Sequence, residues 1–284
     1  MSLLTLLSFL MILPQHYAYA GCQIHKNGVQ ELEGSKVVVS EIVNSERKTD
    51  GHARFPGVAK IIGEWISSGG LVRVIDENGH EAVKLLTGGH NLFGDGSPGF
   101  SAYSNSKDKM DFEVLFGDLT LFTDGVKRVG YEVDRRKTKN KFNIKKDSVR
   151  CLPNVKEKRS SDICWTDLDS KPPDFLVQFN QVNFESIDPN EYPDMFVVGF
   201  FHGFGKDNFR SFTQCKTADV EKNASGVYDF FCTGASGASG SLVLVRHRNG
   251  KDFLVVGVFH GEAVRCIENS FVSGEYKDSV PVSF

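Results

Sequence analysis

The dominant pattern along the chain is a series of short apolar stretches separated by turn residues. Residues 71–75 and 82–86 are two such stretches, and the sequence Asp-Glu-Asn-Gly at 76–79 lies between them. Residues 241–245 and 253–259 form a second pair, joined by a segment that contains an Asn-Gly step. Asparagine followed by glycine is a strong short-range signal for a tight turn between antiparallel strands. Both pairs therefore predict β-hairpins.

The rest of the chain has the same character, and a long stretch with helical periodicity is hard to find. Further apolar stretches lie at residues 112–116, 175–179 and 195–201. The 23 phenylalanines suit the packed faces of β-sheets. Many short strands and frequent turns in a chain of 284 residues predict an all-β fold, either a β-sandwich or a pair of barrels. The segment Ser-Lys-Pro-Pro-Asp at 170–174 is the best candidate for a connection between two halves.

The first twenty residues differ from the remainder. Residues 3–13 are almost entirely apolar, and Ala18-Tyr19-Ala20 follows them. Such a core before two small residues is typical of a secretory signal peptide, which we predict over residues 1–20, although no lysine or arginine precedes it. A short buried helix or a membrane anchor is the alternative, but the core is too short to span a bilayer comfortably. No later segment approaches spanning length, so we expect a secreted or periplasmic protein with no membrane span in its mature chain.

Cysteine content and charge narrow the picture further. Six cysteines follow Ala20, and an even number in an exported chain predicts disulfide bonds. Their spacing does not fit a zinc site, so we expect no structural metal. The formal net charge of −3 gives no global electrostatic reason to bind nucleic acid or an anionic membrane. A basic run at 135–141 is interpreted first as a solvated loop or the face of an edge strand.

The most informative stretch for chemistry lies between residues 232 and 243. Gly237-Ala238-Ser239-Gly240-Ser241 leads directly into an apolar strand. A serine nucleophile needs a tight turn that exposes its Oγ and aims backbone N–H groups at one point, and glycine permits such a turn. Ser236 is a rival candidate, because it also lies in a Gly-Ala-Ser-Gly sequence.

This stretch resembles the nucleophile loop of trypsin-like serine proteases, and most of all the bacterial glutamyl-endopeptidase-like branch. In that branch the sequence Gly-Asn-Ser-Gly-Ser-Pro follows a cysteine, and here Cys232 precedes Ser239. The resemblance implies a disulfide between Cys215 and Cys232. It favours Ser239 over Ser236, because the following strand and hairpin lie at the distance from Ser239 that this family uses.

A general base is implied by a second match. Thr87-Gly88-Gly89-His90, at the end of an expected hairpin strand, resembles the Thr-Ala-Ala-His signature of the family. A histidine at this position accepts the proton of the serine and returns it to the leaving amine. The departures are the two glycines in place of alanines, and Asn91 where many animal members carry cysteine.

The partner of the base is implied by a third match. Residues 162–168, with the sequence Asp-Ile-Cys-Trp-Thr-Asp-Leu, resemble the Asp-Ile-Ala-Leu segment of the family. Asp162 is therefore expected to hold the tautomer of the catalytic histidine and to stabilise its imidazolium. Asp167 and Asp169 are neighbouring alternatives. Cys164 replaces a small alanine and is expected to be either a buried thiol or part of a disulfide.

The same loop implies an oxyanion hole and a mode of activation. The backbone N–H groups of Gly237 and Ser239 are expected to point at the developing negative oxygen. Digestive relatives carry an aspartate just before the nucleophile, where it captures a new N-terminal ammonium, and Ala238 stands there in this chain. We therefore expect no activation by cleavage after Lys60, although Lys60-Ile61-Ile62-Gly63 superficially resembles an activation site.

Residues 256–262 resemble the strand whose edge pairs with the substrate backbone, so protein or peptide substrates are expected to bind as an extended strand. His260 and Glu262 would border the specificity pocket, and Thr233 would lie near its base. A histidine one position earlier marks the glutamate-specific relatives, and Phe259 occupies that place here, which weakens the case for acidic specificity.

The resemblance implies two antiparallel Greek-key β-barrels of the chymotrypsin type, with the active site between them. We expect the first barrel over residues 56–170 and the second over 171–284, preceded by an N-terminal arm or propeptide at 21–55. The implied activity is serine endopeptidase chemistry with no metal or organic cofactor. The alternative is a catalytically inactive protease homologue that acts as an extracellular binding module.

Overall fold

A computed structural model describes most of the chain. The described residues are 23–24, 29–32, 35–38, 43–44, 55–63, 66–93, 111–122, 128–132, 135–136, 138–153, 162–200, 211–231, 238–262 and 268–282. The predicted signal peptide lies outside them. The chain divides into two units, Met1–Val39 and Ser40–Phe284. In the described residues, no helix is long and apolar enough to cross a membrane.

The first unit contains one small antiparallel sheet. Its three strands are β1 (Gln23–Ile24), β2 (Val29–Leu32) and β3 (Ser35–Val38), in that spatial order. The expected arm or propeptide at 21–55 therefore contains strand structure. The last strand of that region, β4 (Val43–Asn44), belongs to the second unit, where it pairs with β15.

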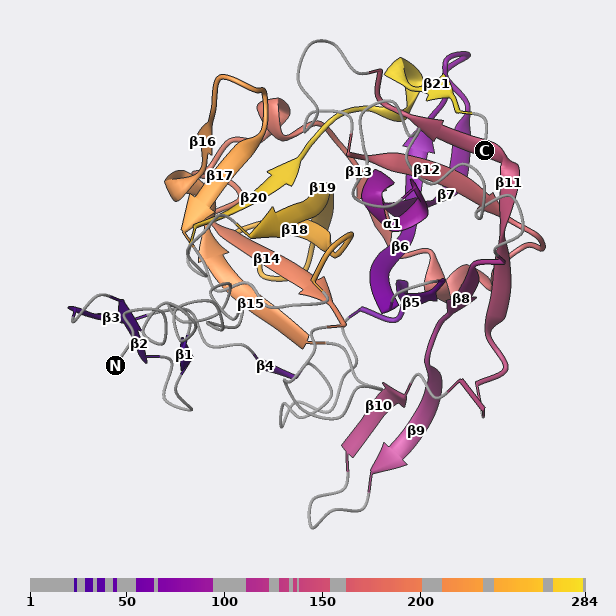
Figure 1. Cartoon of the computed structure of the whole chain (residues 1–284), viewed down its shortest axis with the longest axis horizontal. Coiled ribbons are helices and arrows are strands. Elements are labelled where there is room, and N and C mark those ends of the chain that lie inside the picture. Colours follow the sequence, from indigo (N-terminus) through magenta and orange to yellow (C-terminus); the bar gives the residue numbers. More distant parts are fainter. Residues whose placement is uncertain are drawn as a thin grey trace, which may run out of the picture. The chain divides into compact units, whose positions relative to one another are not determined.

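Six strands in the first half of the large unit close into a barrel (Figure 1). They are β5 (Val58–Ile62), β6 (Ile66–Ile75), β7 (Glu81–Thr87), β8 (Glu113–Leu115), β11 (Lys141–Cys151) and β12 (Cys164–Leu168). The order is β6-β5-β8-β11-β12-β7, and β7 pairs back with β6. All six pairings are antiparallel. A separate hairpin joins β9 (Asp118–Phe122) to β10 (Arg128–Glu132).

Six strands in the second half follow the same order, except that among the described residues the two end strands do not pair to close it. They are β14 (Asp194–Gly199), β15 (Ser211–Lys216), β17 (Tyr228–Phe231), β18 (Leu242–Arg246), β19 (Phe253–Glu262) and β20 (Glu268–Val272). Their order is β15-β14-β18-β19-β20-β17, again antiparallel throughout. In both halves the first strand pairs with the second and the fourth, and the sixth pairs with the fifth and the third. This is a Greek-key arrangement, because the third and fourth strands are consecutive but not neighbours.

Both predicted hairpins are confirmed. The stretches at 71–75 and 82–86 lie in β6 and β7, and those at 241–245 and 253–259 lie in β18, which begins at Leu242, and β19. The turns contain Gly79 with a φ of 81° and Gly250 with a φ of 74°. Only glycine adopts this left-handed conformation without strain, which explains why the turn signal in the sequence was reliable.

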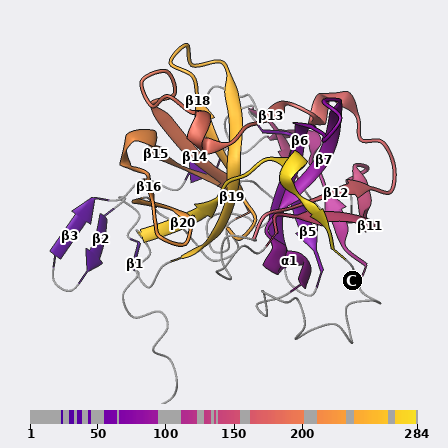
Figure 2. The ribbon, with the colours of Figure 1, turned by 90° about the horizontal axis from the view of Figure 1, so that it is seen from above.

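Three apolar clusters hold the large unit together. One fills the first barrel and includes Ile61 and Leu85, and another fills the second group of strands and includes Val243 and Phe271. The third contains side chains from both halves, with Trp165 of β12 in the same cluster as Leu242 of β18 and Val255 of β19. Figures 1 and 2 show the two groups of strands side by side. The two halves therefore share a core along their junction.

The boundary between the halves is less simple than a division at residue 170. The short strand β13 (Phe179–Gln181) is parallel to both β6 and β19, so it joins the two groups into one sheet. At the C-terminus, β21 (Val280–Pro281) pairs with β11 of the first barrel. Residues 171–284 therefore supply the second group of strands and also a segment that pairs with the first barrel.

The remaining described elements are short. The helical turns are α1 (Gly89–Phe93), η3 (Asp174–Leu176), η4 (Phe184–Ser186), η5 (Thr217–Asp219) and η6 (Tyr276–Asp278). One further strand, β16 (Glu221–Lys222), pairs with β17.

Candidate active site

His90 lies on the single helical turn α1, directly after β7. Leu92 and Phe93 on the same turn are buried in the core of the first barrel, so they anchor the turn from inside. The imidazole of His90 is 17% exposed. Gly88 packs against this ring, because a Cβ built at Gly88 would lie 3.0 Å from the Cε1 of His90. Gly88, which stands where the family motif has alanine, therefore leaves space for the imidazole of His90.

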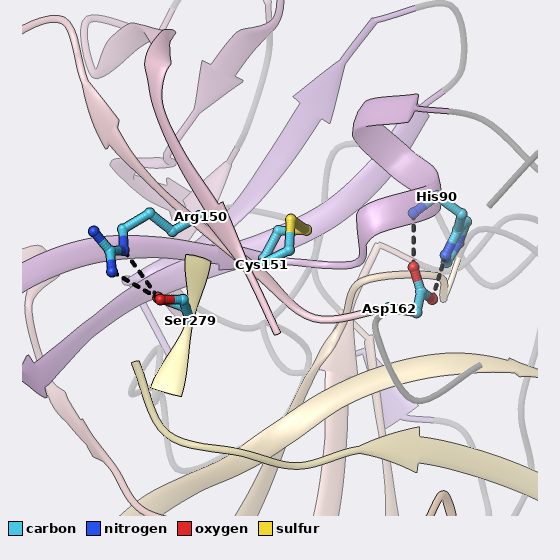
Figure 3. The surroundings of a disulfide bond; sticks show 6 residues. His90, Arg150, Cys151, Asp162 and Ser279 are labelled. Carbon is cyan, nitrogen blue, oxygen red and sulfur yellow. Dashed lines mark hydrogen bonds and ion pairs between the residues drawn. A yellow bond between two sulfur atoms is a disulfide. The ribbon is translucent and has the colours of Figure 1, made fainter. Parts of the chain in front are cut away.

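Asp162 lies two residues before the start of β12. Ile163 and Trp165 after it are fully buried. A disulfide joins Cys164 to Cys151 on β11, and the two strands pair at these same residues. Figure 3 shows the Cys151 disulfide near the pair formed by His90 and Asp162. Of the two alternatives expected for Cys164, the structure therefore has the disulfide, and this bond anchors the chain two residues beyond Asp162.

His90 and Asp162 form a paired contact. The Nδ1 of His90 lies 2.6 Å from the Oδ2 of Asp162, and the backbone N–H of His90 donates to Oδ1 at 2.7 Å. The carboxylate side chain is fully buried. Burial alone would raise the pKa of Asp162, but the imidazoles of His90 and His260 outweigh it and hold the pKa well below its usual value. An ionised carboxylate only accepts hydrogen bonds, so Nδ1 of His90 carries the proton, and in the neutral ring Nε2 is the nitrogen that can accept one.

A second imidazole contacts the same carboxylate oxygen. The Nδ1 of His260, at the end region of β19, lies 2.6 Å from the Oδ2 of Asp162. The ring is 19% exposed and stands edge-on to the ring of His90, with centroids 6.1 Å apart. From the sequence we expected His260 at the border of a specificity pocket. The contact with Asp162 could not be inferred from a motif, because it depends on how the two halves of the chain pack together.

Ser239 lies in a tight turn in front of β18. The backbone N–H of Ser241 donates to the carbonyl of Ala238 at 2.8 Å, which closes the turn. Two further backbone hydrogen bonds, from Gly240 to Phe259 and from Phe259 to Ser241, fasten the turn to β19. Gly240 has a φ of 76°, a conformation that glycine adopts without strain. The prediction of a tight, glycine-dependent turn at the candidate nucleophile is therefore confirmed.

The turn that carries Ser239 is also fastened to the first barrel. The carbonyl of Ser239 accepts hydrogen bonds from the backbone N–H of Ser68 at 3.1 Å and from the Nδ2 of Asn91 at 3.2 Å. Asn91 also donates to the hydroxyl of Thr87 at 3.0 Å. Because Asn91 follows His90 on α1, these bonds bring the backbone of Ser239 beside the turn that carries the histidine. Sequence reasoning noted Asn91 only as a departure from the family and missed this role.

The alternatives to these candidates have other partners or are not described. Asp167 forms an ion pair with Lys84 at 2.7 Å, and Asp169 accepts a hydrogen bond from Asn143. Both carboxylates therefore have bonding partners other than His90. Four other candidates lie outside the part of the chain that the structure describes: the rival nucleophile Ser236, the oxyanion-hole candidate Gly237, the pocket candidate Thr233 and the side chain of Glu262. Cys215 takes part in a disulfide, and its expected partner Cys232 also lies outside them.

The donor set of the site is of a kind that also binds metals. One atom each from His90, Asp162 and His260 lies within 4.8 Å of the others. Two imidazoles and a carboxylate are ligands that zinc accepts in catalytic sites. In the described geometry, however, both Nδ1 atoms face the same carboxylate oxygen at hydrogen-bond distance. We therefore interpret the cluster as a hydrogen-bonded one.

Comparison with known proteins identifies the fold. No protein-family model matches the sequence, and no curated protein sequence is similar to it. Among solved structures, the protease Anisep from Arthrobacter nicotinovorans has a TM-score of 0.52 at 11% identity, over 78% of this chain and 92% of that chain. A Glu endopeptidase in complex with MPD has a TM-score of 0.52 at 13% identity, over 85% and 95%. Human heparin binding protein has a TM-score of 0.50 at 13% identity, over 82% and 90%. The chain therefore has the two-barrel, chymotrypsin-like fold of the trypsin-like serine proteases, as its sequence predicts.

Proposed function

We propose that this chain is a secreted serine endopeptidase with His90, Asp162 and Ser239 as its catalytic triad. One observation carries the proposal. A buried, ionised carboxylate orients the imidazole of His90, and the adjacent residue Asn91 is hydrogen-bonded to the backbone of the Ser239 turn. A structural histidine on the surface of a barrel would need neither a buried carboxylate nor a neighbouring residue that is hydrogen-bonded to a turn with a serine before a glycine.

The reaction follows from the tautomer of His90. Its Nε2 takes the proton of the Ser239 hydroxyl while Oγ attacks the carbonyl carbon of the scissile bond. The resulting imidazolium is stabilised by Asp162 and gives its proton to the leaving amine, which departs and leaves an ester on Ser239. Water then attacks the ester with His90 again as the base, which releases the acid and restores the hydroxyl. The backbone N–H groups of Gly237 and Ser239 are proposed to stabilise the oxyanion in both steps.

An extended peptide is the substrate that suits this site. As far as Phe259, one side of β19 is paired with β18 and the turn at 239–241. The other side is paired with β13 at Leu254 and Val255 and with β20 from Val258 on. Beyond Phe259, residues 260–262 have a paired strand only on the β20 side within the described part of the chain. We propose that the side opposite β20 forms main-chain hydrogen bonds to a substrate strand, beside a pocket to which we assign Thr233, His260 and Glu262.

Secretion is supported by two features of the chain. The disulfide between Cys151 and Cys164 is of a kind that persists in oxidising compartments. The apolar segment before Ala20 has the character of a cleaved signal peptide. N-terminal sequencing of protein recovered from the medium or periplasm should begin at or near Gly21.

Hydrolysis of a mixed peptide library tests the activity and the pocket chemistry together. The mature protein should cleave peptides, the Ser239→Ala variant should not, and the matched control Ser236→Ala should cleave at the wild-type rate. A correctly folded protein without activity would overturn the proposal in favour of an inactive homologue that binds a partner. That alternative has a specific point in its favour, because one structural neighbour is named as a binding protein.

A further inference from the structure

We propose that His260 is a positioning residue for Asp162, which holds the catalytic carboxylate from the second half of the chain. The inference deepens the proposed serine-protease function and rests on it. It assigns to His260 a role in the catalytic machinery in addition to the place beside the substrate pocket that the sequence suggests.

Three hydrogen bonds determine the orientation of the Asp162 carboxylate. Oδ1 accepts the backbone N–H of His90 at 2.7 Å, and Oδ2 accepts the Nδ1 protons of His90 and His260, each at 2.6 Å. The two rings are nearly perpendicular, with an interplanar angle of 87°. They therefore approach Oδ2 from different directions. Two of the three bonds come from the first barrel, and the third comes from β19.

The asymmetry of these contacts distinguishes the two histidines. His90 is bonded to both carboxylate oxygens, through its backbone N–H to Oδ1 and through its ring Nδ1 to Oδ2. His260 contacts only Oδ2. A base must keep its orientation while it gains and loses a proton, so the residue whose backbone is also bonded to the carboxylate suits that task. His260, which is bonded through its ring alone, holds the carboxylate and leaves proton transfer to His90.

Position in the chain supports this role. Residue 259, next to His260, exchanges backbone hydrogen bonds with Gly240 and Ser241 of the nucleophile turn. His260 therefore links Asp162 to the same strand that holds the turn of Ser239. Through this side chain, the Asp162 carboxylate is connected by direct contacts to the strand that holds the nucleophile turn, in addition to the bonds that Asn91 and Ser68 make to the Ser239 carbonyl. Without it, the carboxylate retains its two bonds to His90 but loses the one donor that comes from β19, so its orientation is held less firmly.

The kinetic test compares His260→Ala with His260→Asn. Asparagine carries an N–H donor near the position of Nδ1, whereas alanine carries none. Loss of one hydrogen bond to a buried charge should lower kcat by about ten- to a hundredfold with KM little changed. The asparagine variant should recover most of that loss. A His90→Ala variant should lose far more than either, since it removes the base.

The structural test is independent of activity. In protein labelled with ¹⁵N-histidine, two low-field Nδ1 proton signals are expected, and His260→Ala should remove one while the other remains. Equal kcat for His260→Ala and the wild type, or an asparagine variant as slow as alanine, would overturn the positioning role. A loss as large as that of His90→Ala would also overturn it, because His260 would then act as a base. If both signals are present but the wild type hydrolyses no peptide, the contact between His260 and Asp162 exists and the proposed serine-protease function is wrong. In that case His260 has no catalytic role.

Discussion

Removal of the disulfide between Cys151 and Cys164 should destabilise the fold and disturb the site together. The bond closes a loop with a sequence separation of 13 residues. For a loop of this length, the reduction in the entropy of the unfolded chain corresponds to about 3 kcal/mol of stability. Both cysteines are buried, so the variant Cys151→Ala/Cys164→Ala avoids placing a new polar group in the core.

Urea unfolding followed by fluorescence measures this quantity. The double variant should lose about 3 kcal/mol, and its m value should rise because the unfolded chain becomes more expanded. The matched control is Val149→Ala, a buried residue on β11 that closes no loop. It should lower stability through lost packing by about 1–3 kcal/mol, with an unchanged m value.

Activity provides a second measure of the same change. Cys164 lies two residues after Asp162, so the double variant should also have a lower kcat at full saturation, whereas Val149→Ala should not. A double variant with wild-type stability and an unchanged m value would refute the reasoning, because the disulfide would then neither constrain the unfolded chain nor hold this segment.

Four further predictions concern the immediate surroundings of the site. Asn91→Ala removes the bond to the Ser239 carbonyl and should lower kcat/KM by about tenfold in a peptide-hydrolysis assay, while Asn91→Asp, which cannot donate, should be no better. Gly240→Ala should cost roughly 3 kcal/mol or more in urea unfolding, because the new Cβ would lie 2.1 Å from the Asn91 amide and 2.3 Å from the Ser68 carbonyl oxygen. The lowered pKa of Asp162 means that its contribution to stability is present above about pH 4 and is lost as the pH falls further, so the pH dependence of unfolding below pH 5 should be steeper in the wild type than in Asp162→Asn. The bond after Lys60 lies inside β5, which is paired with both β6 and β8, so the active protein should be uncut there, and an active form whose sequence begins with residue 61 would contradict this.

The sequence was most informative where the local chemistry allows few alternatives. The β6–β7 and β18–β19 hairpins could be predicted because their turns contain glycine in a conformation that other residues adopt only with strain. The turn at Ser239 could be predicted for the same reason. The partner of His90 could be inferred only from resemblance, and the structure supports Asp162 over Asp167, whose carboxylate binds Lys84.

Contacts between distant segments were not predictable in this way. The strand β13 has three residues and β21 has two, so neither presents a periodic pattern that would indicate its pairing. The contact between His260 and Asp162 joins residues 98 positions apart. It exists because β19 and the residues just before β12 lie side by side at the junction of the two halves. Local sequence propensities do not predict such a contact. Asn91 is similar, since its bond to Ser239 spans 148 positions.

Labelling with a fluorophosphonate probe tests the central claim most directly, because the probe reacts only with a serine whose hydroxyl is activated. We predict a single covalent adduct, located by mass spectrometry on Ser239, that is absent from Ser239→Ala and forms far more slowly in His90→Ala. A well-folded protein that remains unlabelled, or an adduct on Ser236 in place of Ser239, would contradict the account.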